Sequence, residues 1–248
     1  MGSAIRALFA GVVAADPSRP MHTFYDDDTG ERTELSGATM DNWVAKTANL
    51  LVDGCGLGEG DVAGVWLPPH WQTAAVLVGC WSAGLTVAYG APSDAGIAVA
   101  FASLEAIEAG GSRISAAPDR YALGLAPLGA PLRSVVPGWL DYIAEVRIHG
   151  DSFAGAPVNP GSPARLEASG ELIGSAEVAA QALARAAEFG IAPGSRVLVD
   201  GDAYPDPRDW LLPALAVGAS TVLCVHVDPT KLVARAASEQ VDLVLGPG

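Results

Sequence analysis

The chain repeats part of its own pattern at a spacing of 134 residues, and this repeat restricts its fold more than any other feature. When residues 41–104 are placed on residues 175–238 without a gap, 12 of 64 positions are identical. An alanine-rich composition alone would give roughly half that number. The shared positions include the glycines expected at turns between helices and strands: Gly56 with Gly190, Gly60 with Gly194, and Gly84 with Gly218. We therefore expect two copies of one structural module.

Each copy alternates helical segments with apolar, strand-like segments. In the first copy, a helix from Asp41 is followed by a strand (DVAGVWLP), a helix (QTAAVLVGCWSAG), a strand (LTVAY), a helix over 94–111 and a strand (SRISAAPDR). In the second copy, a helix from Ser175 precedes SRVLVDGD, DWLLPALAVG, ASTVLCVHV, PTKLVARAASEQ and VDLVLGPG in the same alternation. Alternation of this kind is typical of parallel sheets covered by helices. The predicted fold class is α/β, with two duplicated, helix-flanked and mostly parallel sheet modules.

The remaining segments predict how the modules are connected. The stretch MHTFYDDDTGERTEL is typical of a β-hairpin whose three aspartates form a solvated turn. Between the two modules the chain is rich in proline, and only PGWLDYIAEVRIHG keeps a helical period. We predict a first α/β module over 1–120, a connecting segment with one helix over 121–170, and a second module over 171–248. The three parts can also count as one domain, 1–248.

Composition excludes several kinds of partner. The net charge of −14 opposes binding to nucleic acid, because phosphate binding needs clustered Lys and Arg. No apolar run reaches the roughly 18 residues needed to cross a membrane. The opening AIRALFAGVVAAD favours an amphipathic first helix, capped by Ser3, over a signal peptide. Three cysteines without CxxC spacing, two of them in apolar runs, are typical of a reducing compartment. We expect a cytoplasmic protein with no membrane or nucleic-acid partner.

Several stretches of the chain resemble the front part of adenylate-forming enzymes, the superfamily of acyl-CoA synthetases, luciferases and peptide-synthetase adenylation domains. The stretches are TGERTELSGATMDNWVAKTANLL, GEGDVAGVWLPPHWQTAAVLVGCWSAG, PGSRVLV and LLPALAVGASTVLC. Three shorter segments are similar to a narrower group, a small actinobacterial family with distant similarity to AMP-binding enzymes. They are ERTELS, NWVAKTANLL and LPPHWQTAAVL. That narrower resemblance implies no activity.

The resemblance implies a phosphate loop just before the second module, and the chain departs from it there. The superfamily's loop reads Thr-Ser-Gly-Thr-Thr-Gly-x-Pro-Lys-Gly and holds the phosphates of ATP, whereas this chain reads EASGELIGSAEV. Ser169 and Gly170 remain, Glu171 adds a negative charge, and no lysine is near. Neither Lys46 nor Lys231 matches a lysine position of the superfamily. The chain also ends before the superfamily's adenine-binding segment and mobile C-terminal domain.

His70 and Trp71 are the other candidate ligand-binding residues, together with Ser169 and Gly170. They follow the carboxyl end of an expected strand, where α/β sheets commonly bind ligands. The alternative reading is a helix-start turn built on Pro68 and Pro69, with Trp71 packed into the core; this reading is favoured. The four histidines lack metal-ligand spacing, so we expect no metal site.

The function predicted from these residues is that of a degenerate AMP-binding, acyl-CoA synthetase-like homologue that is not catalytic and binds a ligand or a protein partner. The alternative is an AMP-binding ligase with a rebuilt site, or one completed by another polypeptide. No cofactor is expected under the first reading, and ATP with magnesium under the second. We also expect a homodimer, because surfaces that the missing domains would cover should stay partly apolar.

Overall fold

The computed structural model describes residues 3–90, 96–110, 117–134, 136–155, 159 and 161–246. The chain forms two compact units, and each is assembled from several separate segments. Unit 1 comprises Met1–Ala7, Asp41–Pro68 and Ala75–Val178; unit 2 comprises Leu8–Met40, Pro69–Ala74 and Ala179–Gly248. Residues of the predicted first module, 1–120, therefore belong to both units, and the predicted three-part division remains a prediction. None of the described helices has the length and apolar composition needed to cross a bilayer.

Unit 1 contains a mostly parallel sheet with the strand order β7-β6-β5-β3-β4-β8-β9. Its strands are β3 (Val62–Trp66), β4 (Thr86–Tyr89), β5 (Ile97–Ser103), β6 (Asp119–Leu123), β7 (Leu140–Asp141), β8 (Pro163–Leu166) and β9 (Leu172–Gly174). The pair β8 and β9 is antiparallel, and the other described pairs are parallel. Central strand residues are buried on both faces, as expected for a parallel sheet covered by helices.

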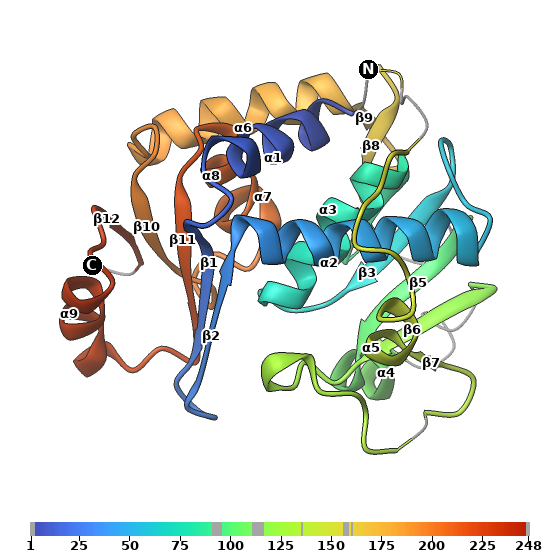
Figure 1. Cartoon of the computed structure of the whole chain (residues 1–248), viewed down its shortest axis with the longest axis horizontal. Coiled ribbons are helices and arrows are strands. Elements are labelled where there is room, and N and C mark those ends of the chain that lie inside the picture. The colour runs from blue at the N-terminus through green and yellow to red at the C-terminus, as the bar shows by residue number, and fades with distance from the viewer. Residues whose placement is uncertain are drawn as a thin grey trace. The chain divides into compact units, whose positions relative to one another are not determined.

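Unit 2 contains a second sheet with the order β12-β10-β11-β1-β2 (Figure 1). Its strands are β1 (Pro20–Asp26), β2 (Glu31–Ser36), β10 (Arg196–Asp200), β11 (Ser220–Val225) and β12 (Leu243–Leu245). The β1–β2 pair is antiparallel and confirms the predicted hairpin. The other pairs are parallel, including β1 with β11. The hairpin therefore extends the sheet of the second module.

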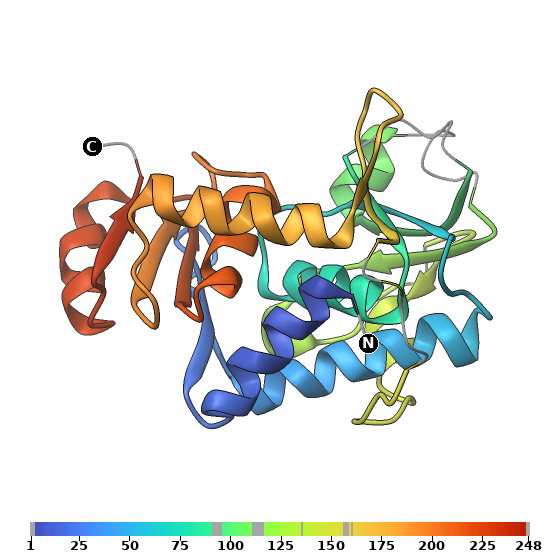
Figure 2. The same cartoon turned by 90° about the horizontal axis from the view of Figure 1, so that it is seen from above.

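Helices separate or cover these strands. They are α1 (Ala4–Ala15), α2 (Gly37–Asn49), the π-helical turn η1 (Leu50–Gly54), α3 (Trp71–Ala83), α4 (Leu104–Gly110), the 3₁₀ turn η3 (Pro127–Gly129), α5 (Tyr142–Val146), α6 (Ser175–Phe189), α7 (Pro207–Trp210), α8 (Leu212–Ala216) and α9 (Pro229–Ser238). The helices α2 and α3 lie side by side in both views (Figures 1 and 2). Gly79 makes this approach possible, because a Cβ there would lie 2.6 Å from Thr47.

The faces of the unit 2 sheet follow from side-chain alternation along its strands. Leu198, Val222 and Cys224 form a buried cluster on one face, and Leu232 and Ala236 of α9 pack against it. The helix α9, red in Figure 1, covers this face. On the opposite face, His22 of β1 lies against Trp210 of α7 with ring centroids 6.1 Å apart, and α8 contacts β11.

The 134-residue repeat is visible in the backbone as far as β4 and β11. Beyond them the predicted repeat is wrong, because the strand β5 (Ile97–Ser103) falls on the helix α9 (Pro229–Ser238) at this spacing. The strand β3 over 62–66 and the strand β10 over 196–200 lie 134 residues apart. The strand order is also the same in both sheets: the first strand of each module lies between its third and its second strand, as β5-β3-β4 and as β12-β10-β11. Each repeated glycine has a positive φ in both copies: 70° and 72°, 99° and 73°, and 88° and 67°. The predicted fold class, with two helix-flanked and mostly parallel sheets, is confirmed.

Two local predictions are wrong. The expected helix over 94–111 is instead the strand β5 followed by α4, with 94, 95 and 111 outside the described residues. The alanines favoured a helix, but Val99–Ala102 are completely buried between two strands, and tertiary burial overrides the weak helix propensity. The helix expected to start at a capping Asp41 is α2, which begins earlier, at Gly37, and the hydroxyl of Ser36 accepts the backbone N–H of Thr39 at 3.2 Å. Most of the strand expected over 112–120 falls outside the described residues.

Candidate functional site

The place of the implied phosphate loop is a tight turn between β8 and β9 in unit 1. The backbone N–H of Glu167 donates to the carbonyl of Glu171, and that of Gly170 donates to the carbonyl of Glu167, both at 2.9 Å. Gly170 has a φ of 88°, a conformation that glycine adopts without steric cost. The hydroxyl of Ser169 accepts the backbone N–H of Glu171 at 3.4 Å. Ser169 and Gly170 therefore lie together in one exposed turn.

The arginines nearest to this turn in sequence are both engaged by carboxylates. Arg165 pairs with Glu167 at 2.6 Å, and its side chain is 13% exposed. Arg185 pairs with Asp209 and Glu188, each at 2.8 Å. Both guanidinium groups are therefore already paired with carboxylates.

The two lysines of the chain are also held by acidic groups. Lys46 pairs with Asp151 at 2.5 Å and donates to the carbonyl of His149 at 2.6 Å. Lys231 lies 3.2 Å from Asp27 and 3.8 Å from Asp228. Each ammonium group therefore serves a local contact within its own unit.

The other candidate pair, His70 and Trp71, opens α3 and is buried in unit 2. The ring of His70 stands edge-on to Phe24 with centroids 4.3 Å apart, and it lies 5.6 Å from the ring of Trp71. The two side chains are 4% and 1% exposed. The structure places them in the core at a helix start, which agrees with the alternative reading of the sequence, a helix-start turn with Trp71 packed into the core.

His70 has a neighbour that sequence spacing did not reveal, the equally buried His22 of β1. Burial lowers the pKa of His22 to about 4 and the pKa of His70 to about 3, and His22 contributes to the second shift. Nδ1 of His70 accepts the backbone N–H of Gln72 at 3.1 Å. The neutral ring must therefore carry its proton on Nε2. Two neutral imidazoles thus lie within the core of unit 2 at neutral pH.

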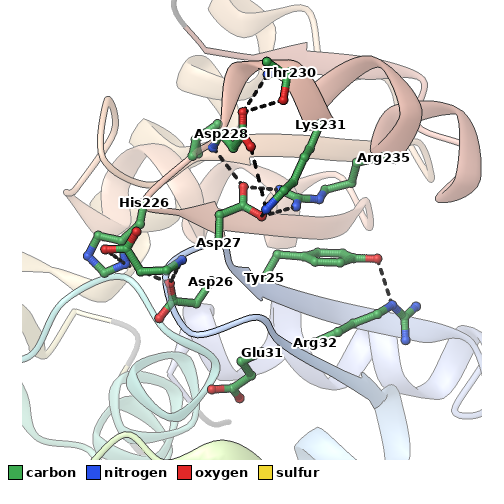
Figure 3. Close-up of polar contacts among 12 residues, drawn as sticks. Tyr25, Asp26, Asp27, Glu31, Arg32, His226, Asp228, Thr230, Lys231 and Arg235 are labelled. Carbon is green, nitrogen blue, oxygen red and sulfur yellow. Dashed lines mark hydrogen bonds and ion pairs between the residues drawn. The ribbon is translucent and has the colours of Figure 1, made fainter.

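A polar cluster at the carboxyl ends of β1 and β11 was not expected from the sequence, which indicated a solvated turn. Figure 3 shows Asp27 between Lys231 and Arg235 of α9. Arg235 donates to both oxygens of Asp27 at 2.6 and 3.2 Å, and its guanidinium lies 4.2 Å from the centre of the Tyr25 ring. Asp27 and Arg235 have side chains only 6% and 7% exposed. The hairpin turn is thereby fastened to α9.

His226 stands beside this cluster with a φ of 49°, a backbone conformation unusual for a residue other than glycine. Its Nδ1 lies 2.9 Å from Asp26, and this hydrogen bond raises the pKa of His226 (Figure 3). A histidine held by a carboxylate is an arrangement in which the imidazole can act as a general base. Within the described part of the chain, however, His226 has no hydroxyl or thiol within hydrogen-bond distance, and no set of three or more His, Cys, Asp or Glu could hold a metal. The pair accounts for the contact between β1 and the end of β11.

The comparisons with solved structures identify the fold. The N-terminal domain of FACL13 from Mycobacterium tuberculosis matches 97% of this chain with a TM-score of 0.72 and 13% identity, over 62% of that domain. Acetoacetyl-CoA synthetase from Streptomyces lividans matches 97% with a TM-score of 0.74 and 16% identity, over 42% of its length. An acyl-CoA synthetase from Brucella canis matches 96% with a TM-score of 0.74 and 16% identity, over 46% of its length. The chain thus spans about half of these proteins and has the fold of their N-terminal parts.

The sequence comparisons identify the family. No family model matches the chain. A protein of Mycobacterium tuberculosis described as a TIGR03089 family protein is 40% identical over 242 residues, which are 96% of this chain and 96% of that protein. Similarity at this level and over nearly the full length of both chains extends to the fold and the core. The chain therefore belongs to the TIGR03089 family.

Proposed function

We propose that this protein is a non-catalytic binding protein built on the fold of adenylate-forming enzymes, and that it binds a ligand or a protein partner. The observation that carries the proposal is the β8–β9 turn, which has two carboxylates, Glu167 and Glu171, and no lysine. A site for ATP phosphates needs N–H donors and positive charge directed at the phosphate oxygens. The turn offers the opposite charge.

The energetics support the same conclusion. Removing one preorganised donor from a site that stabilises developing charge typically costs on the order of 10²–10³ in rate. The turn lacks its lysine, and Arg165 is paired with Glu167. The chain therefore has little means to stabilise an adenylation transition state by itself.

The test is ATP–pyrophosphate exchange with magnesium and a panel of carboxylic acids, together with calorimetric titration of ATP. We expect exchange at the level of a no-protein control and no ATP binding. Exchange well above that control, abolished by Ser169→Ala or Arg165→Ala but kept by Arg133→Ala at an exposed arginine, would overturn the proposal. It would establish a ligase with a rebuilt site that uses ATP and magnesium. Exchange that appears only with a copurifying polypeptide would establish the completed-enzyme alternative.

We also infer that the protein is a homodimer in the cytoplasm. The strand β12 is an edge of its sheet, and Val244 on it is 47% exposed, while Val233 of α9 is 82% exposed. An exposed edge strand with apolar side chains favours pairing with another strand. Free cysteines at 55, 80 and 224 support a reducing compartment.

A further inference from the structure

Unit 2 contains a polar pocket of about 470 Å³. It lies at the opposite end of the strands from the polar cluster around Asp27 and Arg235. It lies at the amino ends of β1, β10 and β11, and its volume falls within the roughly 300–1,000 Å³ of small-molecule sites. Three arginines and three acidic residues line it: Arg19, Arg32, Arg196, Glu34, Glu239 and Asp242. Because the charges of the two signs balance, a simple anion would meet three carboxylates and a simple cation three guanidinium groups.

Four of these six charges already neutralise one another. Arg196 donates to Glu239 at 2.5 Å, and Arg32 donates to Glu239 at 2.9 Å and to Glu34 at 2.8 Å. Burial alone would raise the pKa of Glu239, but hydrogen bonds from Tyr25, Arg196 and Arg32 lower it to about 2. These four residues form a closed network that makes one wall of the pocket.

One charge of each sign remains outside this network. The guanidinium of Arg19 donates to the carbonyl of Gly194 at 2.6 Å, and the carboxylate of Asp242 accepts the backbone N–H of Arg196 at 2.8 Å. Among the residues that the structure describes, neither makes an ion pair. The nearby Asp16 accepts the backbone N–H of Arg19 and attracts its guanidinium electrostatically, without forming an ion pair with it. The pocket therefore offers one cation and one anion to a ligand.

A buried hydroxyl in the same wall lacks a partner. Ser220 is 3% exposed, and its Oγ has no hydrogen bond among the described residues. Leaving such a group unsatisfied typically costs about 1–3 kcal/mol. Ser220 and Arg19 also line a second, smaller pocket of about 60 Å³, whose other walls are mostly apolar and include Val12, Met21 and Ala219, with Asp16 as the one acidic residue. A polar chamber and a small apolar chamber thus meet at Arg19 and Ser220.

We propose that these chambers bind a small zwitterion, an α-amino acid with a short aliphatic side chain. Its carboxylate pairs with Arg19 and accepts the hydroxyl of Ser220, its ammonium group pairs with Asp242, and its side chain enters the apolar chamber. A zwitterion matches the balanced charges of the pocket, which disfavour a ligand of either sign alone. This inference rests on the proposed binding function and names its ligand class.

Calorimetric titration of the full chain with glycine, L-alanine and L-valine tests the proposal, with propionate and isopropylamine as ligands of one sign. We expect L-alanine or L-valine to bind at least tenfold more tightly than propionate or isopropylamine. Ser220→Ala removes an unsatisfied group, so the variant should fold normally and lose about 5- to 10-fold in affinity. Asp242→Asn should lose about tenfold or more, whereas Arg208→Gln, at an exposed arginine of the same unit, should bind like the wild type.

The apolar chamber has its own test. Ala15→Leu, at the exposed end of α1 on the rim of this chamber, should weaken L-valine and leave glycine unchanged. Equal affinity for propionate and L-valine, no effect of Ser220→Ala and Asp242→Asn, or no binding of any amino acid would each overturn the zwitterion site. These results are separate from pyrophosphate exchange, which tests the proposed lack of catalysis and does not depend on this pocket.

Discussion

Asp27 is a single carboxylate that holds two segments of unit 2 together. It lies in the turn of the β1–β2 hairpin and accepts hydrogen bonds from Arg235, Lys231 and the backbone N–H of Asp228. Burial alone would raise the pKa of Asp27, but the contacts from Arg235, from Asp228 and from Lys231 lower it to about 2. A lowered carboxylate pKa means that folding favours the charged form.

Asp27→Asn should therefore reduce the free energy of unfolding by about 2–3 kcal/mol at pH 7, since it leaves Arg235 buried without its charged partner. The stabilisation by Asp27 is fully present above the ordinary carboxyl pKa near 4 and is lost as the pH falls through about 2. Denaturant unfolding between pH 6 and pH 2 measures both effects. Asp28→Asn, whose side chain is 76% exposed, should stay within about 0.5 kcal/mol of the wild type. Equal losses for both variants would contradict the buried ion pair.

The two buried histidines give a second dependence on pH, at higher values. In the unfolded chain each histidine takes up a proton near pH 6.5, whereas the folded pKa values are about 4 for His22 and about 3 for His70. Below pH 6.5 the unfolded state binds more protons than the folded state. Stability therefore falls as the pH drops, by up to about 1.4 kcal/mol per pH unit for each histidine.

His70→Asn should make this decline shallower between pH 6.5 and pH 4.5, because asparagine keeps an acceptor for the N–H of Gln72 and does not titrate. The variant should also lose about 2 kcal/mol at pH 7.5 from lost packing against Phe24. Unfolding free energies at several pH values measure the slope. His149→Asn, at a histidine of unit 1, is the matched control. An unchanged slope in His70→Asn would show that His70 is not buried in the neutral form.

At the scale of elements, the glycines of the repeat carry the same backbone conformation in both copies. Gly56 and Gly190, at φ values of 70° and 72°, follow η1 and α6, and a Cβ at either position would meet nothing within 4 Å. The cost of a side chain there is therefore a backbone cost. Left-handed backbone costs an L-residue about 1–2 kcal/mol.

Gly56→Ala and Gly190→Ala should each lower the free energy of unfolding by about 1 kcal/mol, and by similar amounts. Gly11→Ala should do the opposite, because Gly11 lies inside α1 with open space around its Cβ position. Alanine in a helix interior is favoured over glycine by about 1 kcal/mol. Thermal or denaturant unfolding compares the three variants. A stabilising effect of Gly190→Ala would contradict the shared turn conformation.

The elements that could be predicted from the sequence are those with strong local signals. Three kinds of local signal correctly predicted strands: glycine turns, the DDDTG hairpin, and apolar runs flanked by segments of helical period. The strands predicted in this way are β1, β2, β3, β10 and β11. The strand β5 could not be recognised, because its alanine-rich run suits a helix and only its burial between β3 and β6 makes it a strand. Helix propensity is a weak prior that tertiary packing overrides.

The sites were harder to predict because they depend on pairs distant in sequence. The turn with Ser169 and Gly170 is the local exception: it could be located from the resemblance, and Arg165 pairs there with Glu167, only two residues further on. Asp27 looked like part of a solvated turn, since its partner Arg235 lies 208 residues further along the chain. The pocket around Arg19 joins β1, β10, β11 and the end of α9. No local pattern encodes such a junction.

At the scale of the whole molecule, light scattering at micromolar concentration should give twice the mass of one chain. Val244→Lys, on the edge strand β12, should shift the protein to a monomer, because a lysine on an edge strand opposes strand pairing. Ile148→Lys is the control at a residue 78% exposed in unit 1, and it should leave the mass unchanged. A monomer mass for the wild-type protein would overturn the proposed homodimer.

The pairing of β1 with β11 also determines the order in which the chain can fold during its synthesis. His22 of β1 pairs with Thr221 of β11, so the first strand leaves the ribosome about 200 residues before its parallel neighbour. At 5–20 residues per second, this interval lasts roughly 10–40 s. Throughout that time the β1–β2 hairpin exposes an unpaired edge, the kind of surface that recruits other strands. The nascent chain therefore has a long exposure to aggregation, and its greatest use for a chaperone, until β11 has been made.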